Sequence, residues 1–307
     1  MRDFINLCKM TQPEVKAHMK QYLTDLKYNV VDEDGFLYAK GDVPVLLVAH
    51  MDTVHKAKCT DVVVKDNKIS SPQGIGGDDR CGVYIISEIV KGLRCSVLLC
   101  EDEEIGTIGA RKFVKTDYIN NLDVNYMIEF DRKGSDDAVF YSCDNKKFID
   151  FVTDATGFNV AQGSFSDISV LMPAAKLSAV NLSSGYYNPH TITEFVDFNA
   201  MNDTIYLAMD LIETECAEPF EYVAKEFKWQ RTVNTNQSSF FDMPRQKSLS
   251  EMALEDLYVE LEVLIPDELE IEKAVYVSAK TKAECWTKFF LENPDISFND
   301  IVTYSWC

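Results

Sequence analysis

The sequence predicts an α/β domain with a mostly parallel central sheet, followed by a small α+β module. The main observation is that apolar runs at residues 43–49, 96–100 and 124–130 stop abruptly at polar or charged residues. Such runs are typical of strands that are buried on both faces, as in a parallel sheet. Segments with helical periodicity separate these runs, as the crossovers of such a sheet require. In open sheets of this class, sites form at the carboxyl ends of the strands.

Composition narrows the range of partners and functions. The 307 residues are 46% hydrophobic, with a formal net charge of −20. That charge argues against a nucleic-acid backbone or an anionic membrane as the main partner, because both require cationic surfaces. The nine cysteines are an odd number and lack Cys-x-x-Cys spacing, so we expect free or buried thiols in a reducing compartment. With no apolar signal segment at the start, the expected location is cytoplasmic.

The first elements follow from capping and periodicity. Thr11 and Glu14 have capping-box spacing and open an amphipathic helix. Residues 29–40, with an Asp-Gly pair at their centre, predict a hairpin. The strand at 43–49 follows, and the nearly all-apolar segment 83–93 predicts a buried helix.

Later elements continue the alternation and suggest a second module. We expect helices at 110–114, 146–156 and 198–216, strands at 138–143 and 177–182, and a polar turn at 163–167. The polar stretch 234–250 indicates a linker. Beyond it, we expect a helix at 251–264, a strand at 274–279, a helix at 282–291 and a strand at 301–306. The predicted division is a catalytic domain at 1–216, a linker at 217–250 and an α+β module of unknown role at 251–307.

His50 and Asp52 stand where the strand at 43–49 ends. One ring nitrogen of such a histidine can bind a metal while the carboxylate holds the other ring N–H and fixes the tautomer. An isolated His-x-Asp is more often satisfied by local hydrogen bonds. His55 is the rival ligand in the same segment.

Two further strand ends or loops carry carboxylates. The glycine-rich loop 74–82 contains Asp78 and Asp79, which would repel phosphate, and it lacks the Lys-Ser/Thr of a phosphate-binding loop. A metal fits this loop better. Glu103 and Glu104 end the run at 96–100 and offer one carboxylate to a metal and one to a water beside it. Alone, this block would be interpreted as a solvated charge run.

Together these residues form a set of oxygen and nitrogen donors without thiolate. The set comprises His50, Asp78, Glu103, Glu104, Asp131 and His190. Such donors are typical of hydrolytic zinc, cobalt or manganese sites. A pair of divalent ions needs one shared carboxylate and a terminal set of ligands for each ion.

Five segments in order carry a family resemblance. The segments HMDT, GGDDRCG, EDEEIG, IEFD and NPHTITE resemble motifs of the co-catalytic di-zinc exopeptidase superfamily, which includes leucyl and glutamyl aminopeptidases, glutamate carboxypeptidase and tripeptidases. The resemblance covers roughly residues 40–215. It implies a three-layer zinc-exopeptidase-like domain and two divalent ions, with zinc expected and cobalt or manganese as alternatives.

The resemblance also implies a role for each residue. Asp78 would bridge the two ions. His50 and Asp131 would bind one ion, and Glu104 and His190 the other. Glu103 would be the general base, and Asp52 would orient His50.

The spacing most resembles that of the single-domain aminopeptidases. Between His50 and Asp78, and between Asp131 and His190, the chain is too short for the inserted domains of other members. Substrate contacts that such insertions supply are therefore not expected here.

The expected reaction is hydrolysis of a peptide or similar amide by water that the two ions activate, with Glu103 passing the proton to the leaving amine. A surplus of carboxylates favours a substrate's ammonium group and thus an aminopeptidase; these are Asp79, Glu101, Asp102 and Asp167. Arg80, Arg132 and Lys133 could instead receive a carboxylate. The alternatives are a carboxypeptidase, a deacylase or amidohydrolase of N-acyl amino acids, and a non-catalytic binding protein.

Overall fold

The computed structural model describes residues 1–225, 259–266, 272–279 and 303–306. The chain divides into two compact units, Met1–Trp229 and Gln230–Cys307. In the second unit, the described residues form a three-stranded antiparallel sheet in the order β14-β13-β15. These strands are β13 (Val259–Pro266), β14 (Glu272–Ala279) and β15 (Thr303–Trp306).

The first unit is built on an eight-stranded sheet with the order β1-β2-β6-β3-β7-β10-β8-β9. Its strands are β1 (Val30–Glu33), β2 (Phe36–Ala39), β3 (Val43–His50), β6 (Cys95–Cys100), β7 (Tyr126–Arg132), β8 (Asp137–Val139), β9 (Asn159–Ala161) and β10 (Ala179–Ser183). The four central strands β6, β3, β7 and β10 are parallel to one another. This confirms the expected mostly parallel sheet, although β1, β2 and β8 join it in antiparallel pairings.

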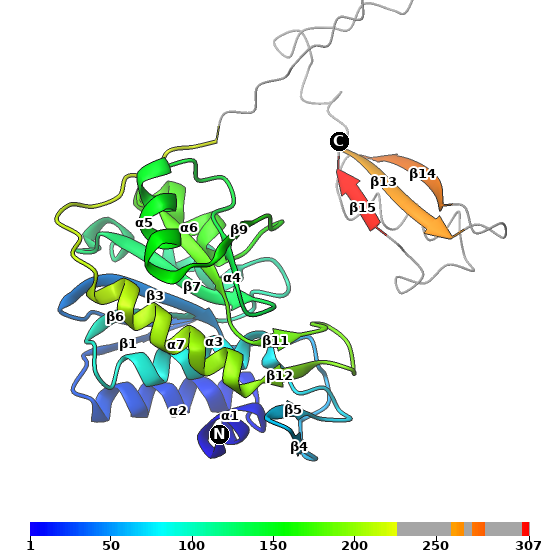
Figure 1. Cartoon of the computed structure of the whole chain (residues 1–307), viewed down its shortest axis with the longest axis horizontal. Coiled ribbons are helices and arrows are strands. Elements are labelled where there is room, and N and C mark those ends of the chain that lie inside the picture. Colours follow the sequence, from blue (N-terminus) through cyan, green and yellow to red (C-terminus); the bar gives the residue numbers. More distant parts are fainter. Residues whose placement is uncertain (226–258, 267–271, 280–302, 307) are drawn as a thin grey trace, which may run out of the picture. The chain divides into compact units, whose positions relative to one another are not determined.

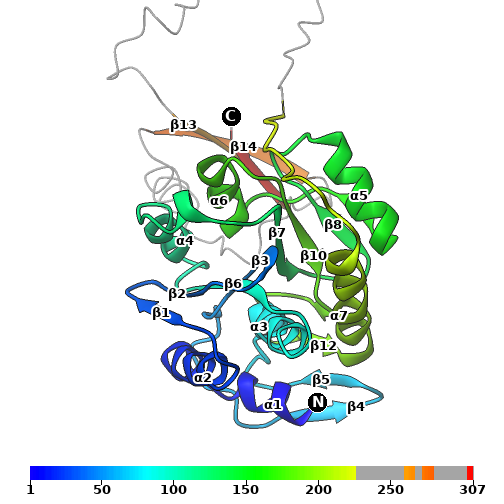
Figure 2. The same ribbon diagram turned by 90° about the vertical axis from the view of Figure 1, so that its left-hand side faces the viewer.

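Helices cover both faces of this sheet and make the three layers (Figure 2). On one face, α3 (Gly77–Ile89) packs on β3, β7 and α7 (Phe198–Glu213). On the other face lie α4 (Ile108–Phe113) and α6 (Asp167–Ala175). Figure 1 also shows α1 (Arg2–Cys8), α2 (Gln12–Asp25) and α5 (Lys146–Thr156). Buried aliphatic side chains of β3, β6 and β7 form the core between the layers.

A second, four-stranded sheet lies beside the first in the order β11-β12-β5-β4. It joins β4 (Val63–Lys65) and β5 (Lys68–Ser70) to β11 (Tyr186–Tyr187) and β12 (Phe195–Asp197). Because β12 pairs with β5, the loop between β11 and β12 is held next to the segment that precedes α3. That loop carries His190.

Some sequence-based expectations are wrong, for identifiable reasons. Residues 259–264 were expected to be helical but lie in β13, where apolar side chains alternate with glutamates in the segment VELEV. The helix α6 was not predicted, because it is short and contains Pro173. The strand expected at 138–143 is shorter than predicted and ends at Val139. The helix expected at 282–291 and the linker at 234–250 lie outside the described residues.

Residues 217–225 belong to the first unit, although the expected domain boundary lies at Cys216. Their carbonyl groups accept hydrogen bonds from the rest of this unit: the Ser178 N–H donates to the Phe220 carbonyl, and the Asp144 N–H donates to the Val223 carbonyl. The ring of Phe220 also packs against Phe148, with ring centroids 5.2 Å apart. Among the described residues, none of the helices has the length and apolar character needed to span a membrane.

Candidate metal centre

The candidate site lies where the central parallel strands end. His50 is the last residue of β3, and Glu103 and Glu104 follow β6, the neighbour of β3. Asp131 lies near the end of β7, the other neighbour of β3. Asp78 lies in the first turn of α3, which packs on β3 and β7. The topology therefore brings the predicted residues to one edge of the sheet.

Two groups of three side chains share Asp78. His50, Asp78 and Asp131 form the first group, with His50 Nε2 3.1 Å from Asp78 Oδ1 and 3.6 Å from Asp131 Oδ1. In the second group, His190 Nε2 lies 3.2 Å from both Asp78 Oδ2 and Glu104 Oε1. Each carboxylate oxygen of Asp78 thus faces a different histidine.

The donor set fits two divalent ions. Within each group, the candidate ligand atoms lie within 4.8 Å of one another, and they are carboxylate oxygens and imidazole nitrogens. Glu104 Oε1 is buried and lies 3.2 Å from His190 Nε2 without the geometry of a hydrogen bond, as expected of two ligand atoms that face one cation. Burial and the nearby Asp78 charge raise the pKa of Asp131 to about 6, so the site crowds negative charge that cations would neutralise.

Asp52 connects the histidine of the first group to the glutamate loop. Its Oδ1 lies 3.1 Å from His50 Nδ1 and accepts the Glu103 N–H at 2.9 Å, while its Oδ2 accepts the Glu104 N–H at 3.1 Å. One carboxylate therefore orients a candidate ligand and the loop that carries the candidate base. Burial raises the pKa of Glu103 to about 8, and the charges of Asp131 and Asp167 act in the same direction.

His55, the rival ligand, lies in neither group. Its Nε2 lies 2.7 Å from Glu194 Oε2. Glu194 is fully buried and also accepts the N–H groups of Gly76 and Asp78, at 3.0 Å each. Glu194 thus holds the loop that presents Asp78. Sequence reasoning missed this role, although the residue closes the NPHTITE segment.

Asp79 is structural in this geometry. It is fully buried and accepts the N–H groups of His50 and Gly82. These bonds fix the end of β3 against the start of α3.

The other carboxylates that were expected to attract a substrate's ammonium group have partners within the protein or are buried. Glu101 pairs with Lys16 at 2.7 Å, Asp102 accepts a hydrogen bond from Gln12 at 3.0 Å, and Asp167 is fully buried. Among the basic residues, Arg132 pairs with Asp137 at 2.7 Å. The charge argument for an aminopeptidase therefore loses its structural basis.

The polar side chains that surround Asp131 were also not predicted from the sequence. Asn181 accepts the Asp131 N–H and donates to its carbonyl, and the Tyr186 hydroxyl donates to Asp131 Oδ1 at 3.1 Å. Ser166 Oγ donates to the buried Glu129 and lies 3.3 Å from Asp131 Oδ2. No local pattern marks these residues, because they come from separate strands and loops.

Comparison with known proteins relates the chain to solved structures alone. No protein-family model matches the sequence, and no curated protein sequence matches it. The structure is similar to aminopeptidase PepT from Bacillus cereus, at 15% identity and a TM-score of 0.60, over 69% of this chain and 96% of the other. It is similar to aminopeptidase APDkam598 from the archaeon Desulfurococcus kamchatkensis, at 15% identity and a TM-score of 0.54, over 69% and 95%.

A third similar structure is the dodecamer PhTET1-12s, at 14% identity and a TM-score of 0.51, over 68% of this chain and 98% of the other. The expected three-layer α/β fold is confirmed by these likenesses and by the mostly parallel sheet. The chain has the fold of aminopeptidases such as PepT and APDkam598.

Proposed function

We propose that the protein hydrolyses peptide bonds with the help of divalent metal ions, as an aminopeptidase. The observation that carries the proposal is the pair of three-residue groups that share Asp78. Glu103 is joined to the first group through Asp52, which accepts its N–H and binds His50. A structural ion-pair network would not need two histidines on opposite oxygens of one buried carboxylate. The likeness in fold to two aminopeptidases supports the same reaction class.

The proposed ligands are His50 and Asp131 for one ion, Glu104 and His190 for the other, and Asp78 for both. When bound, two such ions lower the pKa of water and polarise a scissile carbonyl. Zinc is the expected metal, with cobalt or manganese as alternatives.

The chain's own residues supply proton transfer and orientation. Glu103 takes the proton of the attacking water and returns it to the leaving amine. Its backbone N–H is fixed by Asp52, so the base and the His50 ring keep a constant relation to each other. Asp52 also favours the His50 tautomer whose Nε2 is free to bind a metal.

Metal analysis combined with turnover tests the proposal. The purified chain is dialysed against metal-free buffer, its zinc content is measured, and activity on a mixture of dipeptides is followed as zinc is restored. We expect activity to return with about two ions per chain. A chain that binds no zinc, or whose activity is independent of metal, would overturn the proposal.

Blocked peptides test the direction of cleavage. An aminopeptidase cleaves a C-amidated peptide and spares its N-acetylated counterpart. Faster cleavage of the N-acetylated peptide would favour a carboxypeptidase, and cleavage of N-acyl amino acids would favour a deacylase.

We further propose that the chemistry needs only the first unit, because every proposed site residue lies before residue 225. A chain that ends at Trp229 should keep its metal content and activity. A chain that ends at Cys216 is the informative comparison, because it loses the hydrogen bonds of residues 217–225. Loss of activity in the chain that ends at Trp229 would assign the second unit a role in the site.

A further inference from the structure

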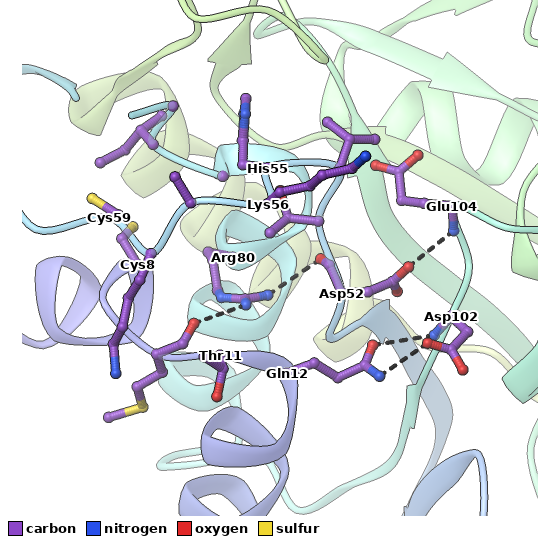
Figure 3. Close-up of a pocket in the computed structure, with 18 of the residues that line it drawn as sticks. Cys8, Thr11, Gln12, Asp52, His55, Lys56, Cys59, Arg80, Asp102 and Glu104 are labelled. Carbon is purple, nitrogen blue, oxygen red and sulfur yellow. Dashed lines mark hydrogen bonds between the residues drawn. The ribbon is translucent and has the colours of Figure 1, made fainter. Parts of the chain in front are cut away.

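A cavity of about 510 Å³ opens beside the candidate metal centre, and its volume is within the range of small-molecule sites. Its walls come from residues 10–12, 52–59 and 74–76, together with Cys8, Arg80, Asp102, Glu104 and Ile105. Figure 3 shows Asp52 and Glu104 on one side of this cavity and Cys8 and Cys59 on the other. Because the cavity includes a proposed ligand, it is positioned to receive part of a substrate whose scissile bond lies at the metal centre.

The carboxylates of this cavity are already engaged. Asp52 binds His50 and the N–H groups of residues 103 and 104, and Asp102 accepts a hydrogen bond from Gln12. Glu104 faces His190 and is a proposed metal ligand. None of the three acts as a free anion for an incoming cation.

Of the two lysines in the cavity wall, one forms an ion pair with a carboxylate and the other does not. Lys58 pairs with Glu14 at 2.8 Å, whereas Lys56 is exposed and takes part in none of the ion pairs formed within residues 1–225. Figure 3 shows the Lys56 side chain extending along the cavity in the direction of Glu104. An unpaired ammonium group therefore lies in the cavity wall on the side of Glu104, a proposed metal ligand.

Buried donors in the wall of the cavity also lack acceptors. Arg80 is 1% exposed and donates to the carbonyls of Met10, Met51 and Asp52, but its Nε has no hydrogen-bond partner and no carboxylate of the described residues pairs with it. Thr53 Oγ1 is likewise buried without a partner. Both atoms have almost no accessible surface, so a molecule in the cavity meets the positive charge of the guanidinium and not these two atoms.

We infer that this cavity binds a carboxylate of the substrate through Lys56, with the buried positive charge of Arg80 behind it. A carboxylate supplies the acceptor oxygens that the Lys56 ammonium group lacks, and both positive charges attract it. The inference rests on the proposed function and narrows its substrate class to peptides with a carboxylate near the scissile bond. Two sources share this chemistry: the side chain of an N-terminal Glu or Asp, and the C-terminal carboxylate of a dipeptide.

Two matched substrate pairs distinguish these sources in the zinc-loaded full chain. Glu-anilide against Gln-anilide tests the side chain, and Leu-Leu against Leu-Leu-amide tests the C-terminal carboxylate. We expect the carboxylate member of one pair to have a KM roughly 10- to 100-fold lower, the range that a hydrogen bond to a charged group contributes. Lys56→Met should abolish that difference and leave the KM of the uncharged member within about twofold. Lys58→Met is the control, because its ammonium group belongs to the Glu14 pair.

A binding measurement separates this inference from the proposed function. Glutarate and its uncharged diamide are titrated calorimetrically into the zinc-loaded wild type and Lys56→Met chains. We expect glutarate to bind more tightly than the diamide in the wild type, and Lys56→Met to reduce that difference. If no substrate is cleaved but glutarate binding depends on Lys56, the proposed function fails and the carboxylate site stands. If neither substrate pair shows a preference, or Lys56→Met weakens charged and uncharged ligands equally, the inference is wrong.

Discussion

The two halves of the candidate centre are built differently. The His50 half comes from adjacent parallel strands, and the His50 side chain is 1% exposed with its Nδ1 held by Asp52. The His190 half comes from loops, and the His190 side chain is 54% exposed. Its backbone φ is +63°, and within residues 1–225 no side chain holds its Nδ1 as Asp52 holds that of His50.

This difference indicates how much of each half exists before a metal binds. Packing and hydrogen bonds hold the His50 half in one geometry whether or not an ion is bound. The His190 half is held mainly by contact with Asp78 and Glu104, so an ion would do more to fix it. We therefore expect unequal metal sites, with the His50 side as the tighter one.

The largest effect is expected for Glu103→Gln, which changes the proposed base and leaves the ligands of both halves in place. The variant keeps the shape and all proposed ligands but removes the proton acceptor, so kcat should fall roughly 10²- to 10⁴-fold. Zinc content after dialysis should match the wild type. Glu101→Gln is the matched control, because Glu101 belongs to the Lys16 pair. Loss of zinc in Glu103→Gln would mean that Glu103 is a ligand.

Removing one histidine from each half tests the asymmetry directly. His190→Ala should retain about one zinc per chain and fold normally, because its side chain is half exposed. His50→Ala should lose zinc from the tighter site and also lose stability, because Asp52, Asp78 and Asp131 are left close together without their shared partner. Zinc analysis and thermal melting of both variants measure this. Equal losses would remove the proposed asymmetry.

A smaller effect is expected for Asp52→Asn, the residue that joins the halves. Changing an outer partner of a metal ligand typically costs roughly 10- to 100-fold in metal affinity or activity. Because Asp52 holds His50 and the glutamate loop together, both zinc affinity and kcat should fall. Asp61→Asn, in the same segment but hydrogen-bonded to Gln73, serves as the control. A change in zinc affinity alone would show that Asp52 supports only the ligands, and a change in kcat alone would show that it supports only Glu103.

The smallest effect is expected for Glu194→Gln. The Gly76 N–H donates to Oε2 of Glu194 and the Asp78 N–H to Oε1, so glutamine keeps an acceptor for only one of them and loses the charge that faces His55. The free energy of unfolding should fall by about 1 kcal/mol. Urea denaturation of the metal-free chain measures it. An unchanged free energy of unfolding would show that the Asp78 loop does not depend on this carboxylate.

The sequence predicted the strand-end half of the site better than its surroundings. His50, Glu104 and Asp131 follow apolar runs, so the rule that strand ends converge was enough to bring them together. Loops carry Asp78 and His190, so the strand-end rule does not place them, and their assignment to particular ions came from the family resemblance. The structure brings all five into the two groups, and their roles as ligands stay a proposal.

The state of the charged neighbours could not be predicted. Glu101, Asp102 and Arg80 have partners that are distant in sequence, namely Lys16, Gln12 and the carbonyl of Met10. A one-dimensional pattern gives charges but not the tertiary contacts that neutralise them. The antiparallel edges of the sheet were missed for the same reason, since strand pairing depends on contacts between distant segments.

The buried Glu194 has a consequence for the order of folding. Its contacts with Gly76 and His55 join segments 118 and 139 positions apart. Until residues 188–197 are synthesised, the Asp78 loop lacks this support and the second histidine is absent. Chains grow at roughly 5 to 20 residues per second, so the nascent protein spends several seconds with only the His50 half available. Metal capture is therefore expected to proceed in two stages during biosynthesis, with the second ion entering only a chain in which residues 188–197 have docked.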